Sequence, residues 1–166
     1  DDQLGAPLYF FREFLSLRFC RVSGLPFLML EGFDFPKKDE DAFIITEYIN
    51  GGSLDLLINS NYIDCPDVIT TKMKILFGIA FAVYILHFNN IIHRDLKPEN
   101  ILLNQNKEPY LADFGFARQI VGDEKAITSG IGTPEYMAPE LVDECEAVPD
   151  KSIDVYSFAV MALEII

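Results

Sequence analysis

The first part of the chain alternates between short apolar runs and polar breaks. Residues 8–22 repeat apolar side chains at helical spacing, which predicts a helix that Gly24 and Pro26 bring to an end. Residues 27–35 and 42–48 are short apolar or β-branched runs on either side of a charged turn, and they predict two strands. The pattern therefore predicts a small unit of one helix and two strands.

Residues 50–53, with the sequence Asn-Gly-Gly-Ser, interrupt this pattern and predict a hinge. Beyond the hinge the pattern is mainly helical, and residues 69–87 carry the clearest helical signal. Their apolar side chains run nearly all the way round the helix, so we expect this helix to be buried inside the domain. We expect His87 to cap its C-terminal end.

The length, the composition and the net charge of the chain restrict the class of protein. The chain has 166 residues, half of them apolar, which is enough for one domain with a hydrophobic core. The formal net charge of −13 argues against a nucleic-acid partner, because a phosphate backbone attracts a basic face. It equally argues against docking on an anionic membrane. A basic protein partner is compatible with this charge, although the usual effect of an acidic surface is solubility.

Cysteine spacing and hydropathy bear on the compartment. The three cysteines, Cys20, Cys65 and Cys145, lie far apart and form no CxxC, which speaks against a zinc site and a disulfide framework. We therefore expect an intracellular, cytoplasmic protein. No signal peptide is visible, and the most apolar stretch, residues 75–86, is shorter than the ~20 residues that span a bilayer.

The candidate chemistry lies between residues 92 and 115. Asp95, Asn100 and Asp113 stand in short turns between apolar segments, and Lys97 follows Asp95 by two residues. Carboxylate and amide oxygens suit Mg²⁺, which keeps water and phosphate oxygens as its other ligands. A lysine can neutralise phosphate charge, and a separate acid can accept a hydroxyl proton. Each of these residues alone is also common in turns, so only their combination indicates a site.

Four segments, in this order, resemble one known family. Residues 93–100 resemble the catalytic loop of eukaryotic-type protein kinases of the serine/threonine class, and residues 113–115 resemble their metal-binding triplet. Residues 138–140 are similar to the triplet that closes the kinase activation segment. Residues 154–158 resemble the start of the following buried helix. The resemblance covers nearly the whole chain and is highly specific as a set.

The resemblance implies an α+β, bilobal protein-kinase-like fold that is present in part. Residues 1–166 are then a single partial domain, in which residues 1–46 are the remainder of the small lobe. Residues 47–52 are the hinge, and residues 53–166 are an incomplete, mainly helical large lobe that stops in its central helix.

The resemblance assigns the chemical roles. Asp95 would orient the substrate hydroxyl and accept its proton, and Lys97 would contact the γ-phosphate of ATP. Asn100 and Asp113 would hold Mg²⁺, which bridges phosphate oxygens. The expected function is therefore phosphoryl transfer from ATP to a protein hydroxyl. The sequence Lys-Pro-Glu-Asn after Asp95, and Gly-Thr-Pro-Glu-Tyr from Gly132, favour serine or threonine as the acceptor.

Further residues receive nucleotide-binding or structural roles from the same resemblance. Thr46 would guard the back of the adenine pocket, and Glu47 and Ile49 would offer backbone groups to adenine. Glu13 would be the acid of the regulatory helix. The remaining assignments are Leu102 in the nucleotide pocket, His93 packed against Phe114, Gly115 after it, Thr133 as a partner of Asp95 and Lys97, and Asp154 in the buried helix.

The activation loop would run over residues 118–131. A phosphate on Ser129, or on Thr128 beside it, would add about −1.5 to −2 charge and pair with Arg94. The alternative is that both are ordinary loop hydroxyls.

Two parts of the kinase pattern are missing from the printed sequence. No Gly-rich phosphate loop and no Val-Ala-x-Lys strand precede Glu13. The arginine with which the family pairs Glu140 would also lie beyond residue 166, and a buried acid without its partner costs roughly 3–5 kcal/mol. We therefore expect the isolated chain to be unstable. The alternatives to an active kinase are a pseudokinase that serves as a scaffold and an inactive truncated fragment.

Overall fold

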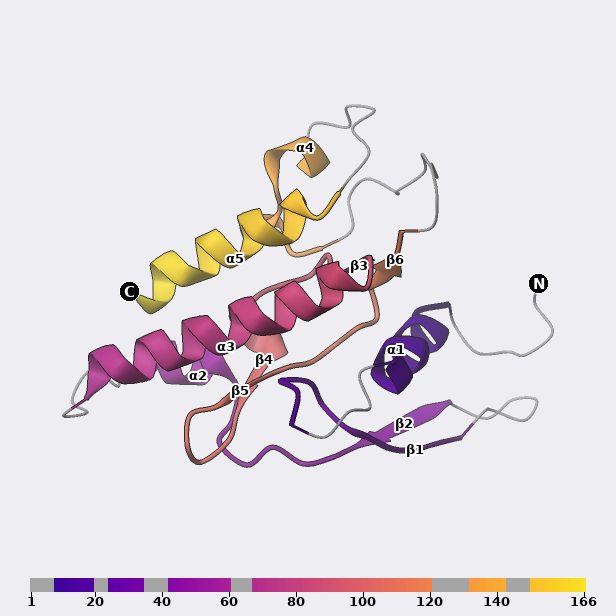
Figure 1. Ribbon diagram of the computed structural model, residues 1–166, viewed down its shortest axis with the longest axis horizontal. Helices are drawn as coiled ribbons and strands as arrows, with labels where there is room; N and C mark the ends of the chain where they lie inside the picture. Colours follow the sequence, from indigo (N-terminus) through magenta and orange to yellow (C-terminus); the bar gives the residue numbers. More distant parts are fainter. Residues whose placement is uncertain (1–7, 20–23, 35–41, 61–66, 121–131, 143–149) are drawn as a thin grey trace.

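The computed structural model describes residues 8–19, 24–34, 42–60, 67–120, 132–142 and 150–166. A helix and a two-stranded sheet form one part of the molecule, and helices with two short strand pairs form the rest (Figure 1). The elements of the first part are α1 (Leu8–Phe19), β1 (Leu30–Asp34) and β2 (Phe43–Thr46).

The larger part follows the hinge and contains ten elements in its described residues. They are α2 (Leu54–Asn59), α3 (Val68–Phe88), β3 (Ile91–Ile92), the 3-10 turn η1 (Pro98–Asn100), β4 (Ile101–Leu103), β5 (Pro109–Leu111), β6 (Arg118–Gln119), the 3-10 turn η2 (Pro134–Tyr136), α4 (Pro139–Val142) and α5 (Ser152–Ile165). α3 runs through the middle of the molecule, with α5 alongside it (Figure 1).

The small sheet is antiparallel and shorter than the sequence predicted. Leu30 pairs with Thr46 and Asp34 with Phe43, with an irregularity between Leu30 and Gly32. The predicted strand over residues 27–35 begins at Leu30 because Phe27 instead forms an isolated parallel bridge with Leu111 of β5. That bridge ties the first part of the molecule to the second.

Two short strand pairs bring the predicted site residues together. β3 pairs with β6 through Ile91 with Gln119 and Ile92 with Arg118, so the loop after β3 lies beside the segment that precedes β6. β4 pairs antiparallel with β5, which places the residues before β4 and after β5 at the same end of the hairpin. These residues are Asn100 and Ala112, and Ala112 N–H donates to Asn100 O at 2.8 Å.

One hydrophobic core links both parts of the molecule. Leu17 of α1, Leu30 of β1 and Phe114 are almost completely buried in the same cluster as Ile79 and Leu86 of α3. Burial of large apolar side chains stabilises the fold by roughly 1.5–3 kcal/mol for each. The core therefore holds α1 against the segment that carries Asp113.

The hinge is fixed to β4 by backbone hydrogen bonds. Gly51 N–H donates to Leu103 O, and Leu103 N–H donates to Gly52 O, both at 2.8 Å. A Cβ at position 51 would collide with Leu103 O, which explains why glycine occupies this position. The residue after it, Gly52, has φ +77, a backbone conformation that glycine adopts without strain.

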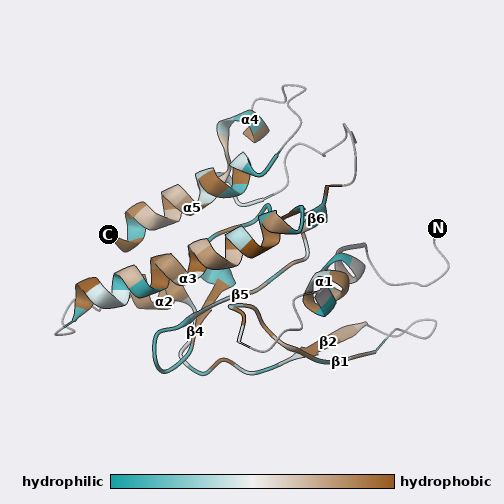
Figure 2. Cartoon of the chain, viewed as in Figure 1, coloured by the Kyte–Doolittle hydropathy of each residue, from teal (hydrophilic) through white to brown (hydrophobic). Residues whose placement is uncertain are grey.

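The prediction that α3 is buried on every side is wrong. One face, with Ile75, Ile79 and Leu86, packs into the core, but the opposite face is open to solvent, with Phe77 and Phe88 each 75% exposed. Figure 2 shows apolar residues along the whole length of α3. Hydropathy alone could not separate the two faces, because both are apolar.

α3 also has the length and apolar composition of a membrane-spanning helix, since it is 21 residues long. The whole helix meets these two criteria for a membrane span, whereas residues 75–86 alone are too short to meet them. It packs against β3, β5 and α5, however, as the central helix of the large part. The core helix of a folded domain satisfies the same criteria, so this feature is weak evidence for a membrane.

The prediction that His87 caps α3 is also wrong. The helix ends at Phe88, and Asn89 is the C-cap, with its backbone N–H and its side-chain amide both donating to carbonyls of the last turn. The His87 ring instead reaches across to α5.

Candidate active site

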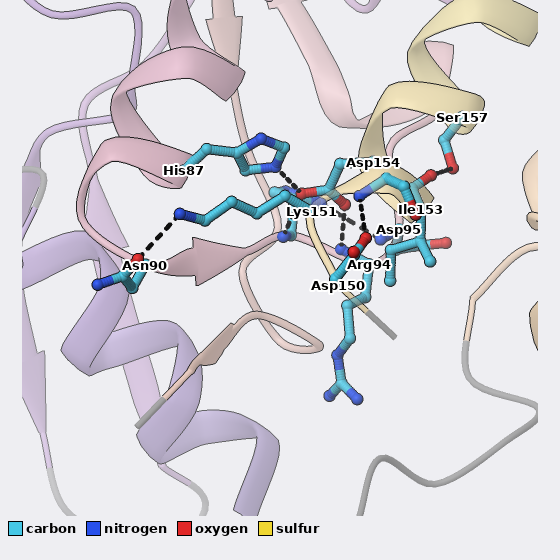
Figure 3. A network of polar contacts seen from close by, with 11 residues as sticks. His87, Asn90, Arg94, Asp95, Asp150, Lys151, Ile153, Asp154 and Ser157 are labelled. Atoms are coloured by element: carbon cyan, nitrogen blue, oxygen red, sulfur yellow. Dashed lines mark hydrogen bonds and ion pairs between the residues drawn. The ribbon is translucent and has the colours of Figure 1, made fainter. Parts of the chain in front are cut away.

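Asp154, in the first turn of α5, anchors the loop that follows β3. Its two carboxylate oxygens accept the backbone N–H of His93 at 2.8 Å and of Arg94 at 2.9 Å. His87 contacts the same carboxylate through Nε2 at 2.8 Å, and Asp154 is completely buried (Figure 3). Arg94 has φ +71, a conformation that costs a non-glycine residue of order 1–3 kcal/mol. The Asp154 hydrogen bonds stabilise this turn, and the turn places Asp95.

Asp95 lies at the centre of a cluster of donors. Thr133 Oγ1 donates to Asp95 Oδ1 at 2.7 Å, while Lys97 Nζ lies 3.1 Å from Oδ2 and donates to Thr133 Oγ1 at 2.8 Å. Asn100 Nδ2 donates to Asp95 Oδ2 at 3.1 Å and to its backbone carbonyl at 2.8 Å. The sequence-predicted residues Asp95, Lys97, Asn100 and Thr133 are therefore in direct contact.

The approach of Thr133 to Asp95 depends on its neighbour. Gly132 has φ +124, and a Cβ at that position would lie 2.8 Å from Arg94 O. Only glycine combines this conformation with so close an approach of two backbones. Gly132 thus allows the activation segment to contact the catalytic loop.

Asn100 and Asp113 have oxygens suited to a magnesium ion. The Asn100 amide nitrogen is used by Asp95, which leaves the amide oxygen as the side chain's ligand atom. Asp113 is exposed, and one of its oxygens accepts the N–H of Gly115 at 3.2 Å. The described residues contain no group of three or more His, Cys, Asp or Glu placed to hold a metal by themselves. One carboxylate and one amide fit Mg²⁺, which takes few protein ligands and fills its octahedron with water and phosphate oxygens.

His93 is unsuited to act as a base. Its ring is completely buried, its Nδ1 accepts the N–H of Asp95 at 3.4 Å, and its Nε2 donates to Ala112 O at 3.1 Å. Burial, the largest influence, lowers the pKa of His93, so the ring is neutral near pH 7. It lies edge-on against Phe114, with the ring centroids 5.2 Å apart. His93 is therefore a packing residue that joins the catalytic loop to Phe114.

The Arg94 side chain forms a positive site beside the activation segment. Its Nε donates to Phe116 O at 2.6 Å, while its Nη2 is buried and has no hydrogen-bond partner among the described residues. Burial, followed by the nearby charges of Arg12 and Arg118, lowers its pKa to about 10. Three arginine side chains thus come together here, on α1, the catalytic loop and β6.

Glu13 on α1 lies within electrostatic range of Asp113. Burial is the main reason that the pKa of Glu13 is raised, and the negative charge of Asp113 raises it further. The structure therefore brings these two predicted residues into electrostatic range, although they are on different parts of the molecule.

The four predicted nucleotide-binding residues gather around the hinge. Thr46 ends β2, and the backbone N–H of Glu47 donates to Met29 O at 3.0 Å. Ile49 packs against the core, and Leu102 forms an isolated bridge with Ser53. Leu102 therefore lies directly beside the hinge.

The predictions about the activation segment have different outcomes. Ser129 and Thr128 lie outside the described residues. Glu140 is only half-buried, and Ser152 Oγ donates to it at 3.4 Å, so the predicted penalty for a buried unpaired acid does not apply.

Two contacts of this region were missed by the sequence reasoning. One is the pair formed by His87 and Asp154, which are 67 residues apart. The other is the hydrogen bond from Tyr136 OH to Glu164 at 3.1 Å, which together with burial, the larger cause, raises the pKa of Tyr136. Neither had a local signal, since the partners come from different elements.

Comparison with known proteins agrees with this geometry. The chain is 34% identical over 127 residues to serine/threonine-protein kinase PAK 1 of Mus musculus and 35% identical over 126 residues to serine/threonine-protein kinase ste20 of Emericella nidulans. Each match covers 76% of this chain, but only 22% and 14% of the respective relatives. The model of the protein kinase domain matches residues 28–166. The chain therefore belongs to the protein kinase domain family.

Proposed function

We propose that this chain provides the catalytic segment of a serine/threonine kinase, which transfers the γ-phosphoryl group of ATP to a hydroxyl of a protein substrate. The observation that carries this proposal is the contact of Asp95, Lys97 and Thr133, with Asn100 beside them. A pseudokinase scaffold would need none of these four side chains in this arrangement.

Asp95 has the acceptor capacity for a substrate hydroxyl. A carboxylate offers about four lone-pair sites, and Thr133, Lys97 and Asn100 occupy three of those on Asp95. The remaining site can accept the O–H of a serine or threonine. This hydrogen bond would orient the hydroxyl oxygen toward the phosphoryl group and take its proton.

Lys97, Asn100 and Asp113 are suited to the charge of the nucleotide. Lys97 is partly exposed, with 22% of its side chain accessible, so its ammonium group can reach a phosphate without leaving Asp95. Asn100 and Asp113 would hold Mg²⁺, which neutralises phosphate charge when bound. Thr46 at the end of β2 and the hinge residues Glu47 and Ile49, with Leu102, would bind the adenine.

The acceptor class follows from residues next to Asp95. Lys97 is tied to Thr133, and the relatives that this chain matches are named serine/threonine kinases. These observations support serine or threonine rather than tyrosine as the acceptor.

We also propose that a phosphate on Ser129 or Thr128 regulates the site through Arg94. The buried Nη2 of Arg94 can donate to a phosphate oxygen, and Arg12 and Arg118 add positive charge nearby. Binding of the phosphate would hold the activation segment against the catalytic loop.

Phosphate transfer from radiolabelled ATP tests the proposed reaction. The protein should label serine and threonine peptides but not matched tyrosine peptides, and Asp95→Asn should lower the rate by about 10²–10⁴-fold. Asp150→Asn is the matched control, because Asp150 lies outside the cluster and bonds Ser152. Magnesium-dependent ATP binding without transfer by the wild-type protein would contradict the proposal and favour a scaffold.

A further inference from the structure

The side of α3 that faces away from the core is a largely apolar surface, bordered by the exposed residues Thr70 and Lys74. We call this surface the outer face of α3. It consists of Ile69, Met73, Phe77, Ala80, Phe81, Tyr84 and Phe88, all of which are exposed. Figure 2 shows that apolar residues extend along the helix to both ends. Large exposed apolar patches of this kind mark interaction sites.

The spacing of the outer face is that of a helix-packing seam. Met73, Phe77, Ala80, Tyr84 and Phe88 follow one another at intervals of four, three, four and four residues, close to the period of side chains that interdigitate between two helices. From the first to the last, the seam spans roughly 22 Å at 1.5 Å per residue. The occupant that matches a straight seam of this length is another long helix.

The exposed area is close to that of a stable dimer interface. Phe77, Phe81, Tyr84 and Phe88 are 75%, 43%, 61% and 75% exposed, which amounts to about 500 Å² at roughly 200 Å² for each side chain. Ile69 and Met73, which are 78% and 60% exposed, add further area. A standard interface takes about 800 Å² from each partner.

Charge distinguishes the outer face from the rest of the molecule. No charged residue belongs to it, and the two lysines on α3 have partners on their own chain. Lys72 donates to Ile166 O, and Lys74 bonds Glu108 and Asn106 O. The chain as a whole carries −13. Two copies would repel each other through most of their surfaces but not through this one, so the outer face is the surface on which they can meet.

A hollow at the edge of the outer face can receive a bulky side chain. It has a volume of about 500 Å³ and is lined by Phe77 and Phe81 of α3, by Pro109 and Tyr110 of β5, and by the charged residues Glu47, Lys74 and Glu108. Gly78 also lines it, and a Cβ at that position would collide with Pro109. An aromatic residue of an opposing helix would fit such a hollow.

We propose that the outer face of α3 pairs with the same face of a second copy of this chain, with the two α3 helices antiparallel. An interface of this kind is self-complementary, because apolar surface meets apolar surface without a conflict of sign. Ala80 lies near the middle of the seam, so the two copies of this small residue meet close to the two-fold axis and allow the helices to approach. Asp95 follows α3 and β3 in the chain and is not part of the outer face.

Sedimentation equilibrium of the full 166-residue chain tests the pairing. The wild type should change from monomer to dimer over roughly 1–200 μM, since interfaces of this size bind at micromolar strength or better. Ala80→Glu and Ala80→Lys should each be monomeric, because like charges meet at the axis. An equimolar mixture of the two variants should recover the dimer. Leu56→Glu is the matched control, because Leu56 is an exposed apolar residue on α2, outside the outer face of α3.

Added NaCl should strengthen the dimer, because it screens the repulsion between two acidic copies. Circular dichroism of both Ala80 variants establishes that they remain folded. A wild type that stays monomeric at ~200 μM would overturn the proposal. So would a dimer that survives both single substitutions, or one that salt weakens.

Discussion

The side chains of the catalytic loop and those of the outer face of α3 differ in where they find their contacts. In the loop and the helix that anchors it, Asp95, Asn100 and Asp154 are buried polar groups; Asp95 and Asp154 accept hydrogen bonds from named donors, and Asn100 donates to Asp95. On the outer face, large apolar side chains such as Phe77 and Phe88 stand in solvent. A buried polar group must find its partner within the fold, because an unpaired one costs a large fraction of the stability. An exposed apolar surface does not need a hydrogen-bond partner within the same fold, and a second molecule can cover it.

Removal of the anchor of the catalytic loop should have the largest effect. Asp154→Ala leaves the buried N–H groups of His93 and Arg94 without acceptors, which costs about 1–3 kcal/mol for each group. The free energy of unfolding in urea should fall by about 2–6 kcal/mol. Glu31→Ala, on the exposed surface of β1, is the control and should change it by less than ~0.5 kcal/mol. Equal losses in the two variants would show that Asp154 is not an anchor.

Substitutions on the two faces of α3 should differ in their effect on the free energy of unfolding, by a smaller but clear amount. Ile79→Ala removes most of a side chain that is 1% exposed and leaves a cavity in the core. The free energy of unfolding should fall by about 2–5 kcal/mol. Phe77→Ala removes a larger side chain from the outer face, yet it should change stability by no more than ~0.5 kcal/mol. Urea unfolding at submicromolar protein keeps the chain monomeric during this comparison. A cost for Phe77→Ala that matches that of Ile79→Ala would mean that the outer face is covered within one molecule.

The smallest expected effect is the pH dependence that His93 contributes. Burial lowers its pKa below the ordinary value of 6.5, so the unfolded state binds a proton that the folded state does not. This contribution to stability is complete above pH 6.5 and is lost as the pH falls below it, by up to about 1.4 kcal/mol per pH unit.

His93→Tyr keeps an aromatic ring against Phe114 but removes the titrating imidazole. Thermal melting between about pH 7.5 and pH 5.5 should therefore show the wild type losing stability relative to the variant. Glu13, whose pKa is raised, titrates in both proteins and acts in the opposite direction, so the difference between the two curves isolates His93. Parallel curves would contradict a buried neutral His93.

Much of the fold and the site could be predicted from local patterns. Helical spacing placed α1 and α3 to within a few residues, and the order of motifs identified the kinase family, to which the chain belongs. Asp95, Lys97 and Asn100 lie within six consecutive residues, so their proximity needed no knowledge of the tertiary structure. Local conformation depends mainly on local sequence, which explains these results.

The tertiary structure decided what the sequence could not. His87 reaches Asp154 from 67 residues away, and no spacing encodes such a contact. Thr133 reaches Asp95 from 38 residues away, and only the resemblance to the kinase family predicted that pairing. The sequence also did not determine which side of α3 enters the core, since a helix that is apolar all round carries no information about its orientation. Only the packing of β3, β5 and α5 selected the inner face, and the same packing left the outer face exposed.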